Sequence, residues 1–233
     1  HRQILDVDAQ QENPGAAFHD IGLAPVAALH LALVERRHGL AQDLVPIRSL
    51  TNGIHAPTWI SPESNSLYAK YLSPDWAERV DDPTIWQRVT DLPDDALWAV
   101  RQTTRRKLMR FIRERARDGW IRGHLQPMQA IARGTLLDPE ALTIGFARRF
   151  ATYKRATLLF RDLDRLKQLL HNRWRPVQIV FAGKAHPADE PGRYFIHEVL
   201  SFCNDHKLGG HVAFLEDYDM HMAKYLVQGV DIW

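Results

Sequence analysis

ALTIGFARRF, residues 141–150, joins a short β-rich apolar run to two adjacent arginines. Two similar runs follow it, PVQIVFAG at 176–183 and HVAFLEDY at 211–218, and helical periodicity fills the intervals between them. Short continuous apolar runs that alternate with helices are typical of buried parallel strands. The pattern predicts an α/β fold, in which a parallel sheet has helices on both of its faces.

The chain on either side of these runs predicts further elements. We expect a helix over Pro25 to Arg37, turns over Val45 to Glu63, and a long amphipathic helix from Pro93 through Arg115. At the other end, Asp231-Ile232-Trp233 reads as the start of a fourth strand. The expected parts are an N-terminal segment (1–44), a turn-rich and helical region (45–137) and a Rossmann-like domain (138–233).

Composition limits the class of protein. The chain has 233 residues, of which 45% are hydrophobic and 25% charged, as in ordinary globular proteins. The net charge of +2 gives no overall field that would favour nucleic acid, so none is expected as a partner. Cys203 is the single cysteine and cannot form an internal disulfide, which favours a reducing, cytoplasmic location. The longest apolar run, Ile21 to Val34, is too short to cross a bilayer, so no membrane association is expected.

The predicted strands place unusual groups at one edge of the sheet. In open parallel sheets, ligands bind beyond the carboxyl ends of the strands. Arg148-Arg149 follow the first strand, Gly183-Lys184 the second, and Glu216-Asp217-Tyr218 the third. This edge is therefore the candidate site.

The basic cluster at this edge has two interpretations. Lys154 is expected about one turn into the helix that follows the first strand, where a helix N-terminus and fixed cations together favour phosphate. Alternatively, the cluster is a solvated helix start that forms salt bridges with Asp162 or Asp164. The groups at the neighbouring strand ends favour the phosphate site.

Four blocks of the chain resemble the bacterial branch of the α-glucan (glycogen) phosphorylases. They read LTNGIHAPTW, DPEALTIGFARRFATYKRATLLFRD, VQIVFAGKAHPADEPG and VAFLEDYDMHMAKYLVQGVDIW. The resemblance runs from about Val45 to Trp233 and leaves residues 1–44 unaligned. It implies part of a two-domain glycosyltransferase fold, with a Rossmann-like sheet and a helical N-terminal part. It also implies transfer of a terminal α-1,4-linked glucose from glucan to inorganic phosphate, which gives glucose 1-phosphate.

The resemblance also implies roles for individual residues. Arg149 and Lys154 match the catalytic ligands of the substrate phosphate, and Tyr153 lines the same site. Arg148 and Tyr218 match positions beside the phosphate of the cofactor, pyridoxal 5′-phosphate, which relays a proton to the substrate phosphate. The expected partners are therefore α-1,4-glucan and phosphate.

One departure from the family concerns the end of the chain. The family's Schiff-base lysine lies in a segment shortly after the Val-Asp-Ile-Trp strand, and this chain stops at Trp233. We therefore expect a fragment that ends before this lysine and is inactive by itself. The sequence leaves the oligomeric state open.

Two other functions remain as alternatives. A nucleotide-sugar glycosyltransferase of related fold shares the sheet but does not need the arginine–lysine block. A polyanion-binding module could use the arginine-rich helix Arg101–Arg117, although this basic face is expected to be solvated.

Several residues have both a functional and a structural interpretation. Asp217, Asp219 and His221 suggest a metal site, but we expect Asp219 to cap the following helix and no metal to bind. His186 is either an acid–base group or a loop residue. Glu216 either lines the site or pairs with a nearby cation. Cys203 is expected to be a small core residue.

Overall fold

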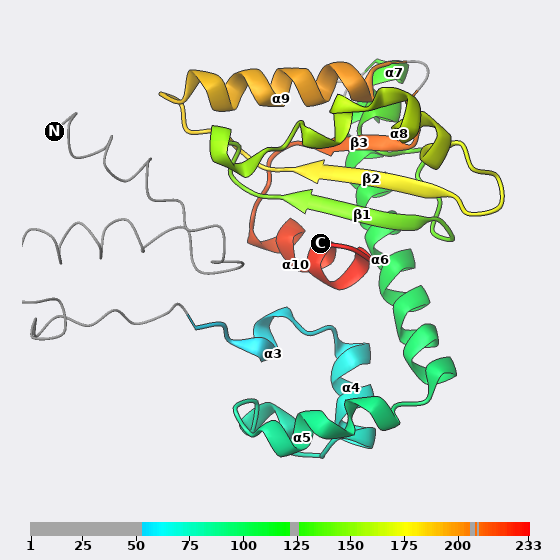
Figure 1. Ribbon diagram of the computed structural model, residues 1–233, viewed down its shortest axis with the longest axis vertical. Coiled ribbons are helices and arrows are strands. Elements are labelled where there is room, and N and C mark those ends of the chain that lie inside the picture. Colours follow the sequence, from blue (N-terminus) through cyan, green and yellow to red (C-terminus); the bar gives the residue numbers. More distant parts are fainter. Residues whose placement is uncertain (1–52, 122–125, 206–207, 209) are drawn as a thin grey trace, which may run out of the picture. The chain divides into compact units, whose positions relative to one another are not determined.

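The sheet positions the candidate site. The computed structural model describes residues 53–121, 126–205, 208 and 210–233. In it, β1 (Leu142–Ala147), β2 (Val177–Ala182) and β3 (Val212–Leu215) are parallel and neighbour one another in that order. Ala147 pairs with Ala182, and Ala182 with Leu215, so the three strands end at one edge (Figure 1). The predicted α/β fold is confirmed.

The chain divides into two compact units, residues 1–55 and 56–233. The sheet and the helices that flank it belong to the second unit. The helix expected over Pro25 to Arg37 lies outside the described residues.

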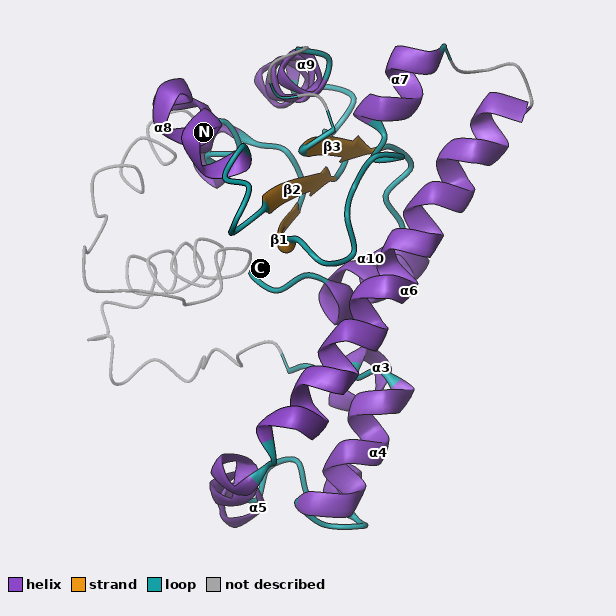
Figure 2. Ribbon diagram, turned by 90° about the vertical axis from the view of Figure 1, so that its right-hand side faces the viewer, coloured by secondary structure: helices purple, strands orange, loops and turns teal. Residues whose placement is uncertain are grey.

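Helices cover both faces of the sheet, because successive side chains of a strand point to opposite sides. Ile179 and Phe181 of β2 pack with α8 (Leu163–Leu170) and α9 (Glu190–Cys203). Val180 and Ala182 pack with α6 (Asp94–Ile121) and α10 (Met220–Gly229). Figure 2 shows these two helix layers with the sheet between them. A strand buried on both faces must be apolar throughout, which explains the continuous apolar runs of the sequence.

Cys203 lies in the first of these layers and is fully buried. Burial raises the pKa of its thiol to about 12, so the thiol stays protonated at neutral pH. The prediction that Cys203 is a small core residue is confirmed.

The long helix α6 packs against α10 along its buried face. Leu108 and Ile112 are fully buried there, and Gly229 of α10 comes so close that an added Cβ would lie 2.5 Å from Leu108 Cβ. The helix predicted from Pro93 through Arg115 is confirmed and extends to Ile121.

The region before α6 contains several short helical elements. Its elements are α3 (Ala56–Trp59), α4 (Pro62–Tyr71), η2 (Trp76–Glu78), α5 (Pro83–Gln87) and η3 (Arg88–Asp91), and α7 (Pro127–Ala132) follows α6. Within the turns expected over Val45 to Glu63, residues 56–59 and 62–63 are helical instead, while 53–55, 60 and 61 are not. Ser61 caps α4 by accepting the Ser64 N–H at 3.0 Å, and Pro62 opens the helix. Trp76 is buried in this region, and the ring of Tyr68 meets it edge-on at 5.3 Å.

The end of the chain pairs with β1 on the side away from β2. Ile232 forms an isolated parallel bridge with Ile144, and the Gly145 N–H donates to Ile232 O at 2.8 Å. This pairing agrees with the predicted start of a fourth strand.

A buried ionic cluster, the Asp231 cluster, ties this end to α6. Asp231 Oδ1 accepts from Arg101 Nη2 at 3.0 Å and from Arg105 Nη2 at 2.8 Å. Its other oxygen, Oδ2, accepts the Thr143 N–H at 2.9 Å. The arginines on this part of the predicted basic face are therefore packed against the sheet, and the expectation of a wholly solvated face is wrong.

None of the helices in the described part of the chain is both long and apolar enough to cross a membrane.

Candidate functional site at the carboxyl edge of the sheet

The β1 loop, residues 148–155, continues the pairing of β1 with β2 beyond the strand ends. The Arg148 N–H donates to Ala182 O at 3.2 Å, and the Phe150 N–H donates to Lys184 O at 3.0 Å. These bonds hold the backbone of Arg148 and Arg149 beside the loop that follows β2. Both arginine side chains are exposed.

Two glycines allow the β1 loop to approach its neighbours this closely. Gly183 has φ +152°, and a Cβ added there would overlap the carbonyl oxygen of Arg148 and lie 2.8 Å from Phe150 Cε2. A Cβ added to Gly192, in the first turn of α9, would lie 2.5 Å from Phe150 O. Gly192 was not predicted from the sequence, although a glycine directly after Asp189-Glu190-Pro191 at a helix start was a visible signal.

Phe150 anchors the β1 loop in the core. Its side chain is fully buried, and its ring lies 5.8 Å from Phe146 and 5.8 Å from Phe214, measured between ring centroids. A buried aromatic directly after two exposed arginines restrains where the guanidinium groups can reach. The loop is therefore a fixed platform for cations.

The chain then turns in a way that corrects the expected position of Lys154. Thr152–Lys154 form a short 3₁₀ turn, η4, and Arg155 has φ 53°, in the left-handed region. The α-helix of this connection, α8, begins only at Leu163. Lys154 therefore does not lie one turn into a helix, and no helix N-terminus adds to its charge.

The residues between this turn and α8 form a second short 3₁₀ turn, η5 (Leu158–Arg161). Ala156 and Phe160 are buried, while Leu158 and Leu159 between them are 50% and 43% exposed. The ring of Phe160 stacks on that of Phe202 with centroids 3.9 Å apart. This stacking anchors η5 to α9.

Lys154 and Tyr153 lie together in this turn. Lys154 Nζ lies 4.7 Å from the centroid of the Tyr153 ring, in a cation–π contact. Tyr153 is 55% exposed, whereas Lys154 is half-buried. The aromatic ring holds the ammonium group without neutralising its charge.

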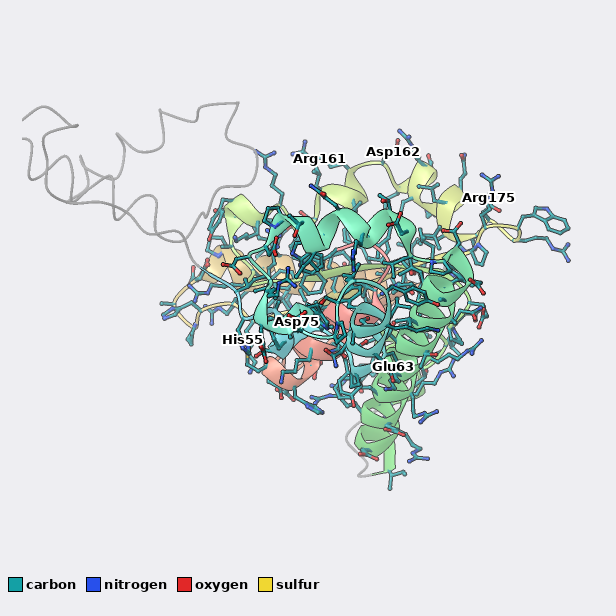
Figure 3. All side chains as sticks on the ribbon, turned by 90° about the horizontal axis from the view of Figure 1, so that it is seen from below. His55, Glu63, Asp75, Arg161, Asp162 and Arg175 are labelled. Carbon is teal, nitrogen blue, oxygen red and sulfur yellow. The ribbon has the colours of Figure 1, made fainter. Side chains whose placement is uncertain are left out.

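The cations of the site do not pair with carboxylates in the part of the chain that the structure describes. Arg148, Arg149, Lys154 and Lys184 form no ion pair with any described residue. Asp162, labelled beside Arg161 in Figure 3, instead caps α8 by accepting the Arg165 N–H at 3.0 Å. The alternative interpretation, in which the basic cluster forms salt bridges with Asp162 or Asp164, is therefore wrong.

Tyr218 lies at the same edge, three residues after β3. Its side chain is half-buried and packs against the α6–α10 side of the core. Burial raises the pKa of the Tyr218 phenol, so the group is neutral at pH 7 and can donate a hydrogen bond. β1 and β3 are separated by two strand spacings, roughly 10 Å, so Tyr218 and the two arginines follow strands on either side of β2.

Several nearby residues have structural roles. Glu216 forms an ion pair with Arg133, which decides between its two interpretations in favour of a partner for a cation. Asp219 caps α10 by accepting the Met222 N–H at 2.7 Å, as predicted. His186 Nδ1 accepts the Ala188 N–H at 3.2 Å, as a loop residue does. Within the described residues, no group of three or more His, Cys, Asp or Glu side chains could hold a metal ion.

Comparison with known proteins relates the chain to one kind of enzyme. Glycogen phosphorylase of Aquifex aeolicus is 37% identical over 242 residues, which cover 100% of this chain and 35% of that protein. Glycogen phosphorylase of Mycobacterium tuberculosis is 41% identical over 195 residues, covering 84% of this chain and 22% of that protein. Maltodextrin phosphorylase of Thermococcus litoralis is 37% identical over 214 residues, which cover 89% of this chain and 25% of that protein. The chain thus spans about a third or less of these relatives' lengths. No protein-family model matches it.

Proposed function

We propose that this chain, which corresponds in sequence to a portion of the α-glucan phosphorylases, binds the phosphate that attacks a terminal α-1,4-linked glucose. The product of this transfer is glucose 1-phosphate. The observation that supports the proposal most is a loop held rigidly at the carboxyl edge of the sheet, whose cations have no carboxylate partner among the described residues.

The residues of the β1 loop suit this task chemically. A phosphate dianion needs hydrogen-bond donors of fixed position, and the planar guanidinium of Arg149 can bind two of its oxygens at once. The ammonium of Lys154 adds a compact second charge, held against the Tyr153 ring. In the reaction, the bond between glucose C1 and the glucan oxygen breaks, the proton of the bound phosphate goes to that oxygen, and a phosphate oxygen bonds to C1. The bound phosphate stabilises the positive charge that develops on the sugar.

The donor set also fits a second phosphate group, that of pyridoxal 5′-phosphate, a general feature of the phosphorylase family. When bound, this cofactor supplies a phosphate that exchanges a proton with the substrate phosphate. Arg148 is exposed and unpaired with any described carboxylate, and the neutral phenol of Tyr218 is a hydrogen-bond donor. We assign these two residues to the cofactor phosphate.

The proposal predicts the effect of removing single cations. Arg149→Ala and Lys154→Ala should each weaken the binding of inorganic phosphate to the chain by about tenfold, because each removes a charged hydrogen-bond donor. Isothermal titration calorimetry of the 233-residue chain with phosphate measures this effect.

The matched control is Arg175→Ala. Arg175, labelled in Figure 3, is exposed and lies two residues before β2, so it is at the opposite end of this strand from Gly183 and Lys184. The Arg175→Ala substitution should leave the affinity for phosphate unchanged. Phosphate affinity that is equal in wild type, Arg149→Ala and Lys154→Ala would refute the assignment.

A further inference from the structure

A second basic site lies on α6, well away from the β1 loop. A cavity of about 350 Å³ lies where this helix meets the segment before β1. Met109 and Pro139 line it together with four arginines, Arg106, Arg110, Arg113 and Arg117. We call this cavity the arginine groove. The spacing of four, three and four residues brings these side chains to one face over about 16 Å of helix.

Two of the arginines are held in place by the segment before β1. Arg113 Nη2 donates to Leu137 O at 2.6 Å, and Arg106 Nη2 lies 3.2 Å from Glu140 Oε1. A guanidinium group has five N–H donors, so most donors of both remain available to a ligand. The groove thus has pre-positioned donors along one wall.

The charges in the groove do not balance. Glu114 lines it and Glu140 pairs with Arg106, so two carboxylates face four guanidinium groups. Arg110 and Arg117 form no ion pair within the described parts of the chain. The groove therefore has an excess of about two positive charges, and like charges this close favour the binding of an anion.

The other arginines of α6 are engaged elsewhere. Arg101 and Arg105 are bound to Asp231, and Arg115 lies over the ring of Phe111. The groove is therefore a distinct part of the helix, rather than one section of a uniform basic face.

The groove is also separate from the proposed phosphate site. Leu137, Pro139 and Glu140 precede β1, so the groove borders the amino end of this strand. Arg148 and Arg149 follow its carboxyl end. The six residues of β1 span about 20 Å, so one small ligand cannot reach both sites.

We propose that the arginine groove binds a compact polyphosphate, meaning a ligand with two or three linked phosphate groups. Its volume is near the lower end of small-molecule sites, which suits such a ligand. Linked phosphates can contact guanidinium groups on successive helical turns, and each contact can be bidentate. A neutral glucan offers no charge to this groove, and a single orthophosphate cannot span it.

The test uses tripolyphosphate as the probe and calorimetry of the 233-residue chain. The double variant Arg110→Gln/Arg117→Gln should bind tripolyphosphate more than about tenfold more weakly than wild type. Both side chains are exposed and unpaired with described carboxylates, so the variant should fold, which thermal unfolding verifies. Raising the salt concentration should weaken wild-type binding, because the groove is open to solvent.

The matched control, Arg161→Gln/Arg175→Gln, also removes two positive charges. These two arginines, labelled in Figure 3, precede and follow α8. This control should retain tripolyphosphate binding. Equal loss in the control, or no loss in Arg110→Gln/Arg117→Gln, would overturn the proposal. The proposal would also be overturned if a single-stranded oligonucleotide bound more tightly than tripolyphosphate and lost this binding in Arg110→Gln/Arg117→Gln.

Discussion

Replacing Asp231 with alanine should lower the free energy of unfolding by about 3 kcal/mol, the usual cost of removing one partner from a buried ion pair. Arg105 is 3% exposed and its guanidinium group would remain in the core without a counter-charge. The Thr143 N–H would also lose its acceptor. Urea unfolding of the 233-residue chain at pH 7 measures the change.

The control for this substitution is an exposed ion pair between the same helix and the segment before β1. Glu140 and Arg106 are both 55% exposed, so Glu140→Ala should change stability by less than about 1 kcal/mol. An Asp231→Ala variant as stable as Glu140→Ala would mean that the Asp231 cluster does not hold α6 to the sheet.

The same cluster predicts a pH dependence. Burial by itself would raise the pKa of the Asp231 carboxyl, but hydrogen bonds from Thr143, Arg101 and Arg105 outweigh it and lower the pKa below its ordinary value of 3.8. A carboxyl with a lowered folded pKa stabilises the protein above its unfolded pKa, and this stabilisation is lost as the pH falls through the folded value. The difference in free energy of unfolding between wild type and Asp231→Ala should therefore stay constant from pH 7 to about pH 5 and become smaller below pH 3.8.

Replacing Gly183 with alanine should cost about 3 kcal/mol or more of stability and should also abolish phosphate binding. The new methyl group would overlap the Arg148 carbonyl oxygen, and the residue would have to hold a φ of +152°. The obstructing atom belongs to the backbone, so relief requires the whole β1 loop to move. That movement would displace Arg148 and Arg149 from the sheet edge.

The neighbouring residue provides the control for stability. Lys184 is exposed and forms no ion pair in the described parts of the chain, so Lys184→Ala should change stability by less than about 0.5 kcal/mol. Urea unfolding and phosphate calorimetry of both variants decide the matter. A Gly183→Ala protein with wild-type stability and wild-type phosphate affinity would show that the close approach of the two loops is unimportant.

The sheet could be predicted from the sequence because each strand is marked locally. Residues 141–147, 176–183 and 211–218 are apolar throughout most of their length, as strands buried on both faces must be, and helices separate them. Parallel order and a shared carboxyl edge then follow from the alternation alone.

The details of the site depend on contacts between distant residues, which the local pattern does not contain. Lys154 lies in a turn and not a helix, and the turn ends at Arg155, whose left-handed backbone (φ 53°) does not continue an α-helix. Arg101 and Asp231, 130 positions apart, meet only when α6 crosses the end of the chain. The sequence of α6 shows arginines along its whole length and does not distinguish their roles. In the structure, some of them belong to the Asp231 cluster and others to the arginine groove.

The central claim is that the β1 loop binds phosphate, and one measurement addresses it directly. Titration of the ¹⁵N-labelled 233-residue chain with inorganic phosphate, followed by amide chemical shifts, locates the bound ion without any substitution. We expect the largest saturable shifts at the amides of Arg148 to Arg155, with smaller changes at Lys184 on the adjoining loop. Unshifted amides throughout this loop at saturating phosphate, with the largest shifts instead on α6 beside Arg110 and Arg117, would contradict the account.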